Sequence, residues 1–173
     1  MMAITRTIAV LNQMKADGVV KDYAIGGAVA ATFHLEPGAT LDVDVFIPLE
    51  PKGGSALLNM QPIFDYLIAQ GHRVEGEYVH IEGWPVQFLP LADPLVEEAL
   101  SEAVSTEVEG VPTRVFSAEH LVGIALQTGR PKDKARILQF LASGALDMDR
   151  LRDILRRHDL IERWQQFERT FLS

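Results

Sequence analysis

Apolar and polar residues alternate strictly in the segment LDVDVFIPL, residues 41–49, and this pattern predicts a β-strand. A shorter strand is expected near residues 22–25, followed by a Gly-Gly turn and a helix of small residues. Further strands are predicted at 72–77, 78–83, 85–90 and 112–116, and helices at 5–17, 28–35, 56–70 and 95–104. Connections rich in Gly and Pro separate several of these elements, as at residues 36–39 and 50–55.

From Ser117 onward the pattern is helical only, with expected helices at 117–129, 130–144, 147–160 and 161–172. Their ends carry helix signals: Ser117 as N-cap, Gly129 and Gly144 as C-caps, and Pro131 near a first position. Strands mixed with helices, followed by helices alone, predict an α/β (α+β) body over residues 1–115. A C-terminal helical lobe is expected over residues 116–173.

The composition suits a globular protein and narrows the chemistry. The chain has 173 residues, 47% of them apolar, and no cysteine, which excludes disulfides, a thiolate nucleophile and Cys-ligated zinc. A reducing cytoplasm is the expected setting, the N-terminus is typical of an amphipathic helix rather than a signal peptide, and no stretch is apolar enough to cross a bilayer. The five histidines show no zinc-binding spacing.

Charge is unevenly distributed along the chain. The net charge of −8 argues against a surface coated for nucleic-acid binding. Residues 1–129 carry 6 basic and 17 acidic side chains, whereas residues 130–173 carry 10 basic and 7 acidic ones. A basic lobe on an acidic body could face an anionic ligand, although a helical surface rich in arginine explains the same counts.

Asp42 and Asp44 are the unusual residues of the alternating strand. They point to the same face of the sheet, together with Phe46. Aspartate is depleted in strands, and two like charges placed this way repel each other. A divalent cation such as Mg²⁺ or Mn²⁺ between the two carboxylates would explain this cost, because Mg²⁺ prefers oxygen ligands.

Gly26 and Gly27 fit the same chemistry. A strand that runs into a Gly-Gly turn and then a helix exposes backbone N–H groups that no side chain shields from a phosphate. A Gly-Gly pair alone is a weak signal, and so is Asp-x-Asp alone. The ordered combination of strand, Gly-Gly, helix and Asp-x-Asp strand is more specific.

With Gly26, Gly27, Asp42 and Asp44 in this order, the sequence resembles the minimal nucleotidyltransferases of the polymerase-β-like superfamily. The segment EHLVGIALQTGRPKDKARI also resembles the abortive-infection, toxin-type branch, in which a helix leads into Gly-Arg-x-x-Asp. The matching residues are Gly129, Arg130 and Asp133. The resemblance implies a nucleotidyltransferase-like mixed sheet with flanking helices, and an active-site cleft where the lobe meets the Asp-x-Asp strand.

The resemblance also implies a mechanism. Two metal ions would hold a nucleoside triphosphate while an acceptor hydroxyl attacks the α-phosphate and expels pyrophosphate. Asp42 would bridge both metals, and Asp44 would complete the nucleotide-bound one. The nucleotide-binding residues would be Gly26, Gly27, Arg130, Lys132 and Asp133, with the two basic side chains offsetting phosphate charge.

Three positions depart from the family pattern. Gln87 stands where the third catalytic carboxylate is expected, and a neutral amide binds a metal more weakly and cannot accept a proton. Ala125 replaces a lysine, and Arg136 replaces a further acid. Glu75, Glu77 or Glu82 could supply a carboxylate from neighbouring strands, although the plainer interpretation is that all three face solvent. Asp133 likewise has a purely structural interpretation, a favourable acid at a helix start.

Two functions therefore fit the sequence. The first is a metal-dependent nucleotidyltransferase with an incomplete carboxylate triad, acting on a small molecule, a protein or an RNA end, and forming part of a toxin–antitoxin pair. The alternative is a catalytically degenerate relative that binds nucleotide or a protein partner without chemistry. The Asp pair favours the first function, and Gln87 and Ala125 favour the second.

Overall fold

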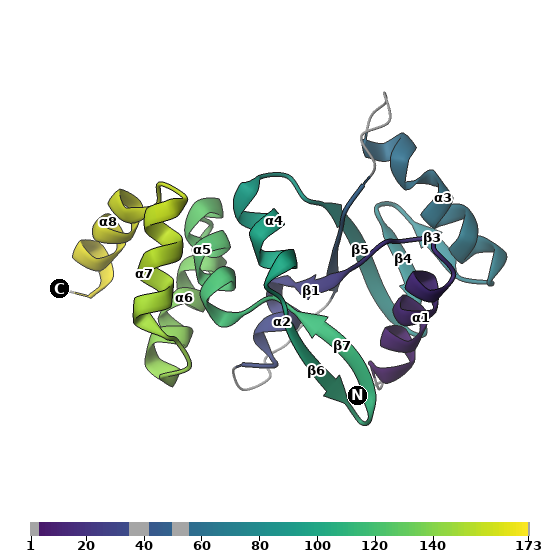
Figure 1. Ribbon diagram of the computed structural model, residues 1–173, viewed down its shortest axis with the longest axis horizontal. Helices are drawn as coiled ribbons and strands as arrows, with labels where there is room; N and C mark the ends of the chain where they lie inside the picture. Colours follow the sequence, from purple (N-terminus) through teal and green to yellow (C-terminus); the bar gives the residue numbers. More distant parts are fainter. Residues whose placement is uncertain (1–3, 35–41, 50–55, 173) are drawn as a thin grey trace.

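Seven strands form one mixed sheet in the computed structural model, which describes residues 4–34, 42–49 and 56–172 (Figure 1). The strand order is β3-β4-β5-β2-β1-β7-β6. The strands are β1 (Ala24–Gly26), β2 (Val43–Ile47), β3 (Arg73–Glu75), β4 (Tyr78–Ile81), β5 (Trp84–Pro90), β6 (Val104–Val108) and β7 (Val111–Val115). The parallel pairs β2–β5 and β1–β7 lie within the sheet, and antiparallel hairpins form its two edges.

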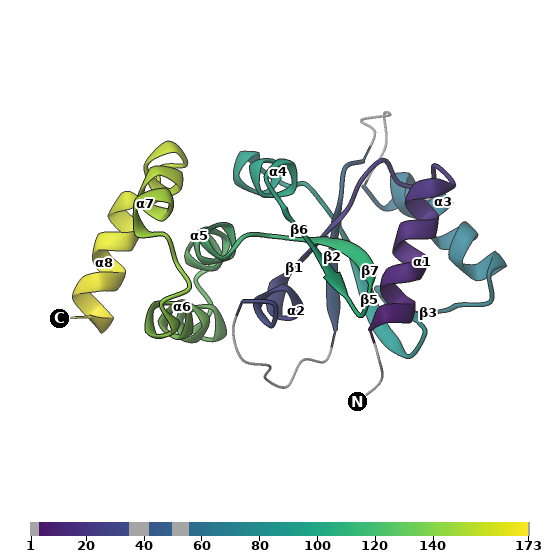
Figure 2. The same ribbon diagram turned by 60° about the horizontal axis from the view of Figure 1, so that its bottom comes forward.

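Helices lie at both ends of the molecule (Figures 1 and 2). In the first part of the chain they are α1 (Thr5–Ala16), α2 (Gly27–Ala31), α3 (Ala56–Ala69) and α4 (Pro94–Ser101). The lobe consists of α5 (Ala118–Thr128), α6 (Pro131–Ser143), α7 (Met148–Arg157) and α8 (Ile161–Phe171). The lobe helices gather at the end that holds the C-terminus, whereas α1 and α3 lie at the opposite end.

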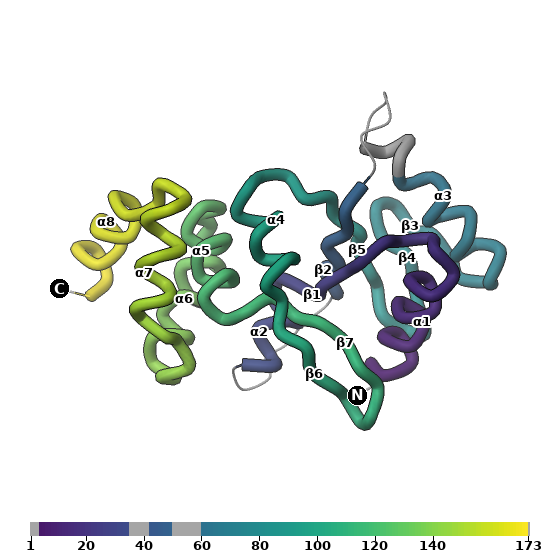
Figure 3. The backbone as a smooth tube through the Cα atoms, viewed as in Figure 1, coloured from purple at the N-terminus to yellow at the C-terminus, as the bar shows by residue number. Residues whose placement is uncertain are grey.

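The backbone passes from β7 directly into α5 (Figure 3). β7 ends at Val115, so the division into residues 1–115 and 116–173, which stays a prediction, falls between the sheet and the lobe. The helix signals of the lobe act as expected. Ser117 accepts a hydrogen bond from the backbone N–H of His120, and Gly129 adopts the left-handed conformation that ends α5.

The alternation in β2 produces the expected two faces. Val43, Val45 and Ile47 are fully buried, while Asp44 and Phe46 on the opposite face are partly buried. The mixed α/β fold class with flanking helices is therefore confirmed. The connecting segments expected at 36–39 and 50–55 lie outside the described residues.

One strand was missed, and the helices expected over 28–35 and 95–104 were predicted too long. The first of these, α2, ends at Ala31, and residues 32–34 form a turn. The helix expected over 95–104 ends at Ser101, and β6 begins at Val104. β6 and β7 form a hairpin whose turn has positive φ at both Glu109 and Gly110. Only Val104 of β6 falls within the expected helix, and residues 105–108 were assigned to no element. β6 lies at the sheet edge and is largely exposed, so no buried alternation marks it. None of the helices in the described ranges is long and apolar enough to cross a membrane.

Candidate functional site

The Gly-Gly turn lies directly against the second aspartate of the pair. Gly26 is the cross-strand partner of Asp44 in the antiparallel pairing of β1 with β2. Gly27 has a φ of 59°, and a Cβ added to it would collide with the Asp44 carboxylate. Glycine is therefore required at position 27 both by the backbone conformation and by the closeness of the carboxylate.

Gln87 is the neighbour of Asp44 on the other side. The two residues occupy paired positions of the parallel strands β2 and β5, so their side chains share one face of the sheet. Asp42 precedes β2 by one residue and is partly buried. The structure thus brings the Gln87 position next to the Asp pair, as the proposed alignment with the third-carboxylate strand requires. Its role in catalysis stays a prediction.

A cavity of about 520 Å³ separates this face from the lobe. The sheet contributes Asp44 and Gln87, α2 contributes its first residue, Gly27, and the lobe contributes Arg130 and Asp133. The remaining lining residues are Phe46, Leu89, Asp93, Val96, Phe116, Leu121, Ile124, Ala125, Gln127, Thr128 and Arg136. The cavity lies at the expected place, between the Asp-x-Asp strand and the lobe.

The electrostatics of the cavity centre on Asp44. Burial raises its pKa from 3.8 to about 6, and the charge of Asp42 adds to this rise. Three basic side chains of the lobe, Lys132, Arg136 and Arg130, oppose it. Ionisation of Asp44 therefore costs free energy in the folded protein, and a cation bound beside it would favour its charged form.

Arg130 and Asp133 are held together at the start of α6. The Asp133 carboxylate accepts hydrogen bonds from the backbone N–H of Arg130, at 3.2 Å, and from its side-chain Nε, at 2.7 Å. Asp133 is almost completely buried, whereas about half of the Arg130 side chain is exposed. Asp133 thus has the structural role of a helix cap and also fixes a cationic side chain in the wall of the cavity.

Comparisons with known proteins show which fold this chain shares. No protein-family model and no curated protein matches the sequence. Among solved structures, an antigenic nucleotidyltransferase-like protein from Paracoccidioides brasiliensis aligns with a TM-score of 0.62 at 14% identity, over 94% of this chain and 92% of that one. The chain has a nucleotidyltransferase-like fold.

The antibiotic-resistance factor ANT(2'')-Ia aligns as well, in two structures. Its crystal structure with adenylyl-2''-tobramycin gives a TM-score of 0.52 at 19% identity, over 91% of this chain and 98% of that one. Its solution structure aligns with a TM-score of 0.54 at 19% identity, over 98% of both chains. The similarity extends over both the sheet and the lobe, and at these identities it concerns the fold.

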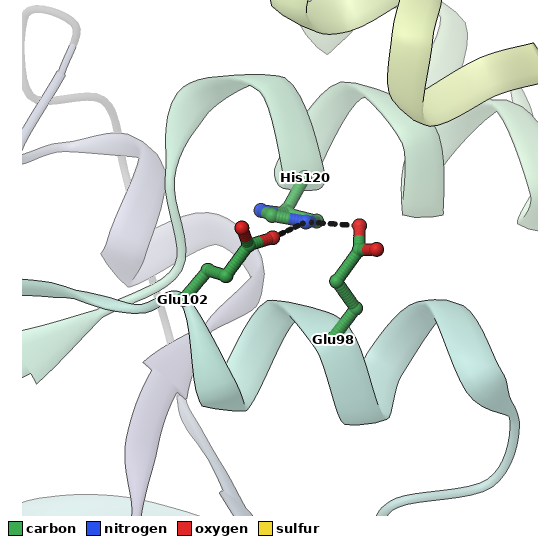
Figure 4. A group of neighbouring side chains, drawn as sticks. All are labelled: Glu98, Glu102 and His120. Carbon is green, nitrogen blue, oxygen red and sulfur yellow. Dashed lines mark hydrogen bonds and ion pairs between the residues drawn. The ribbon is translucent and has the colours of Figure 1, made fainter. Parts of the chain in front are cut away.

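A second group of side chains could also hold a metal ion, namely Glu98, Glu102 and His120 on α4 and α5 (Figure 4). Their ligand atoms lie within 4.8 Å of one another, and both carboxylates point toward the imidazole. His120 Nε2 lies 2.8 Å from Glu98 and 3.5 Å from Glu102. No sequence spacing revealed this group, because two helices bring it together.

Within this second group, the charge of Glu98 is compensated by a basic side chain of the lobe. Arg157 of α7 pairs with Glu98, and Ser117 Oγ lies 2.7 Å from Nδ1 of His120. Burial acts to raise the pKa of Glu98, but hydrogen bonds from Arg157 and His120 outweigh it and lower the pKa to about 2. Glu98, Arg157 and His120 therefore form a latch that joins α4, α5 and α7. The Asp pair differs, because repulsion between its carboxylates favours a cation.

The sequence did not reveal the approach of Arg136 to the site or the contact between Glu77 and Gln87. Arg136, noted there only as a departure from a family pattern, lines the cavity and opposes the rise in the pKa of Asp44. Glu77, which was favoured as solvent-facing, accepts a 3.0 Å hydrogen bond from Gln87 Nε2 while remaining exposed. Only the register of β4 against β5, a tertiary feature, could have revealed that contact.

Proposed function

We propose that this protein is a metal-dependent nucleotidyltransferase that moves a nucleoside monophosphate from a nucleoside triphosphate to an acceptor hydroxyl. The observation that supports this most is the convergence of Gly27, Asp44 and Arg130 on one cavity, at the boundary of the sheet and the lobe. The nucleotidyltransferase-like fold supports the same proposal.

The donor set of the site fits Mg²⁺ or Mn²⁺. Asp42 and Asp44 offer two carboxylates on one face of the sheet. Burial and the charge of Asp42 raise the pKa of Asp44, so a cation bound beside it would favour its charged form. These two residues would hold the metal, which when bound supplies charge neutralisation for the triphosphate and its leaving pyrophosphate.

The chain's own groups would bind and orient the nucleotide. Arg130, Lys132 and Arg136 bring positive charge toward Asp44 from the lobe, which suits an anionic triphosphate between lobe and sheet. Gly27 leaves the start of α2 without a side chain, so that phosphate oxygens could approach it. Gly26 is buried, and the space that a Cβ would take there is filled by Phe46 and Phe116. Asp133 would act through Arg130, by holding its guanidinium in place.

The acceptor is a small molecule, a protein or an RNA end. The adenylylated tobramycin in the ANT(2'')-Ia complex makes a small-molecule hydroxyl the first class to test. The Gly129–Asp133 segment supports the more specific proposal of a toxin-type enzyme in a toxin–antitoxin pair, with a protein partner and a cytoplasmic setting.

The alternative function is binding of a nucleotide or a protein partner without chemistry. It is favoured by Gln87 and Ala125, which line the cavity at positions where the resembling family has charged residues. Where the bound partner is a nucleotide, both functions place it in this cavity and differ in whether a nucleotidyl group is transferred.

A label-transfer experiment distinguishes the transferase from the protein that binds without chemistry. The pure protein is incubated with each α-labelled nucleoside triphosphate, Mg²⁺ or Mn²⁺, and a fractionated cell extract or a panel of small polyols. The transferase predicts a labelled acceptor and released pyrophosphate with wild type, and neither with Asp44→Asn. Saturable, metal-dependent nucleotide binding without label transfer to any acceptor would favour the alternative.

A further inference from the structure

The turn between β3 and β4 places an acidic side chain beside Gln87. Glu75 and Tyr78 are paired across this hairpin, and Gly76 and Glu77 form its tip, with Gly76 at a φ of 63°. β4 in turn pairs with β5, which carries Gln87. The tip therefore projects beside the strand position that faces Asp44.

The contact at this tip determines how the Gln87 amide is turned. Gln87 Nε2 donates a 3.0 Å hydrogen bond to Glu77 Oε2. This hydrogen bond orients the amide nitrogen of Gln87 toward Glu77, and the carbonyl oxygen is the amide atom that remains available to a ligand. A carbonyl oxygen is the only amide atom that can ligate a hard cation. Because Gln87 is paired with Asp44, that oxygen belongs to the same face as the Asp pair.

Glu77 differs from the other acid of the hairpin in its partners. Glu75 is paired with two basic groups, Arg73 at 3.3 Å and His80 at 3.0 Å. Within the part of the chain that the structure describes, the partners of Glu77 are the neutral side chains of Gln87 and Tyr78. These contacts leave the negative charge of Glu77 uncompensated. The pKa of Tyr78 is raised first by Asp42 and further by Glu77 and Asp44, so the hairpin tip lies within the field of the Asp pair.

We propose that Glu77 is a positioning residue of the metal site, and that the Glu77–Gln87 pair takes the place of a third carboxylate. Gln87 provides the carbonyl oxygen next to Asp44, and Glu77 fixes the amide and adds the negative charge that glutamine lacks. This inference rests on the proposed function, because it assigns the metal to the Asp pair. It explains how a chain with glutamine at this position retains a third oxygen ligand.

Manganese binding by the full-length protein tests the inference without any need for activity. The concentration of free Mn²⁺ is followed by electron paramagnetic resonance during titration of wild type, Glu77→Gln and the matched control Glu75→Gln. Both variants remove one negative charge from the same hairpin. Loss of an outer hydrogen-bond partner of a metal ligand typically costs about 10- to 100-fold in affinity. We expect a loss of about tenfold for Glu77→Gln and of less than twofold for Glu75→Gln.

The same substitution in a Gln87→Glu background distinguishes a positioning role of Glu77 from a purely electrostatic one. In Gln87→Glu the chain carries its own carboxylate beside Asp44, and Glu77 now repels it. Adding Glu77→Gln there should leave Mn²⁺ affinity unchanged or raise it, the opposite of its effect in wild type. Equal losses in the two backgrounds would mean that Glu77 acts only as a distant charge, and equal effects of Glu77→Gln and Glu75→Gln would also overturn the inference.

The failure of this inference is distinguishable from that of the proposed function. If wild type binds Mn²⁺, Asp44→Asn abolishes binding and Glu77→Gln leaves it unchanged, the role of Glu77 is refuted and the Asp-pair site stands. If wild type binds no Mn²⁺, or binds it equally well with Asp44→Asn, the proposed metal site itself is refuted. Thermal melting of each variant without metal checks that its fold is intact.

Discussion

Asp44 is the residue of the proposed site that lies beside most of its other members. The turn glycine lies against its carboxylate, Gln87 occupies the paired position on β5, and the charge of Asp42 acts on it along the strand. Burial and a like charge make its ionised form costly in the protein without metal. Residues that are kept at a cost to stability are candidates for function, and this cost can be measured.

Replacing Asp44 by asparagine should stabilise the metal-free protein at neutral pH. The folded-state pKa of about 6 lies above the unfolded value of 3.8. Stabilisation by the protonated form is therefore fully present below pH 4 and is lost as the pH rises through about 6. Asparagine resembles the protonated form, so Asp44→Asn should gain about 1–3 kcal/mol at pH 7.5 and almost nothing at pH 4.

Urea unfolding of both proteins in EDTA at these two pH values measures the difference. A variant less stable than wild type at pH 7.5 would show that Asp44 has structural partners, and a gain that persists at pH 4 would contradict the titration of Asp44.

The closeness of Gly27 to the site can be tested by alanine substitution, with Gly129, which has a similar backbone conformation, as the control. Gly27 and Gly129 have φ values of 59° and 71°, so alanine is strained at either position, by about 1–2 kcal/mol. A Cβ at 27 would also displace the Asp44 carboxylate, whereas a Cβ at 129 meets only a backbone oxygen at 3.8 Å. Gly27→Ala should therefore be the more destabilising variant and should lose Mn²⁺ binding, while Gly129→Ala keeps it. Equal Mn²⁺ affinities would contradict the close approach of Gly27 to the site.

Sequence reasoning anticipated the part of the site that depends on local pattern. The shared face of Asp42 and Asp44 follows from the period of a strand, and the placement of Gly27 follows from the order of strand, turn and helix. The contact of Glu77 with Gln87 and the approach of Arg136 to Asp44 depend on how distant segments pack. No spacing along the chain specifies such contacts.

At the scale of elements, the latch of Glu98, Arg157 and His120 connects α4 of the body with α5 and α7 of the lobe. The caps of α5 and α6 were predictable because glycine and proline have specific backbone roles at helix ends. β6 was not, because an exposed edge strand lacks a buried face. The latch holds together the two parts that form the cavity.

Glu98→Gln should weaken this connection. The folded-state pKa of Glu98, about 2, lies below the ordinary glutamate value of 4.5. Its stabilising contribution is therefore present above pH 4.5 and is lost as the pH falls toward 2. We expect a cost of about 1–3 kcal/mol at pH 7 that shrinks near pH 3. Glu102→Gln is the control, since Glu102 is about half exposed and lies 3.5 Å from His120, and it should cost well under 1 kcal/mol.

Urea unfolding at pH 7 and pH 3 provides the comparison. Equal costs for the two variants, or a cost of Glu98→Gln that stays constant with pH, would show that Glu98 does not carry the latch.

At the scale of the whole molecule, an acidic body and a basic helical lobe meet at one cavity. The body contributes Asp44 to the lining, and the lobe contributes Arg130 and Arg136. The charges of Asp42 and Lys132 also act on Asp44. This division of charge suits a ligand that carries a metal cation on one side and phosphate anions on the other. A nucleoside triphosphate with a divalent metal has both.

The most direct test is the metal dependence of nucleotide binding. Calorimetric titration with non-hydrolysable α,β-methylene triphosphates, each with and without Mn²⁺, compares wild type with Asp42→Asn/Asp44→Asn and with the control Glu107→Gln on exposed β6. We expect Mn²⁺ to strengthen binding of at least one nucleotide about tenfold or more in wild type and in the control, and to have no effect in the double variant. Equal Mn²⁺-dependent binding by the double variant and wild type would contradict the assignment of the metal and nucleotide to the Asp pair.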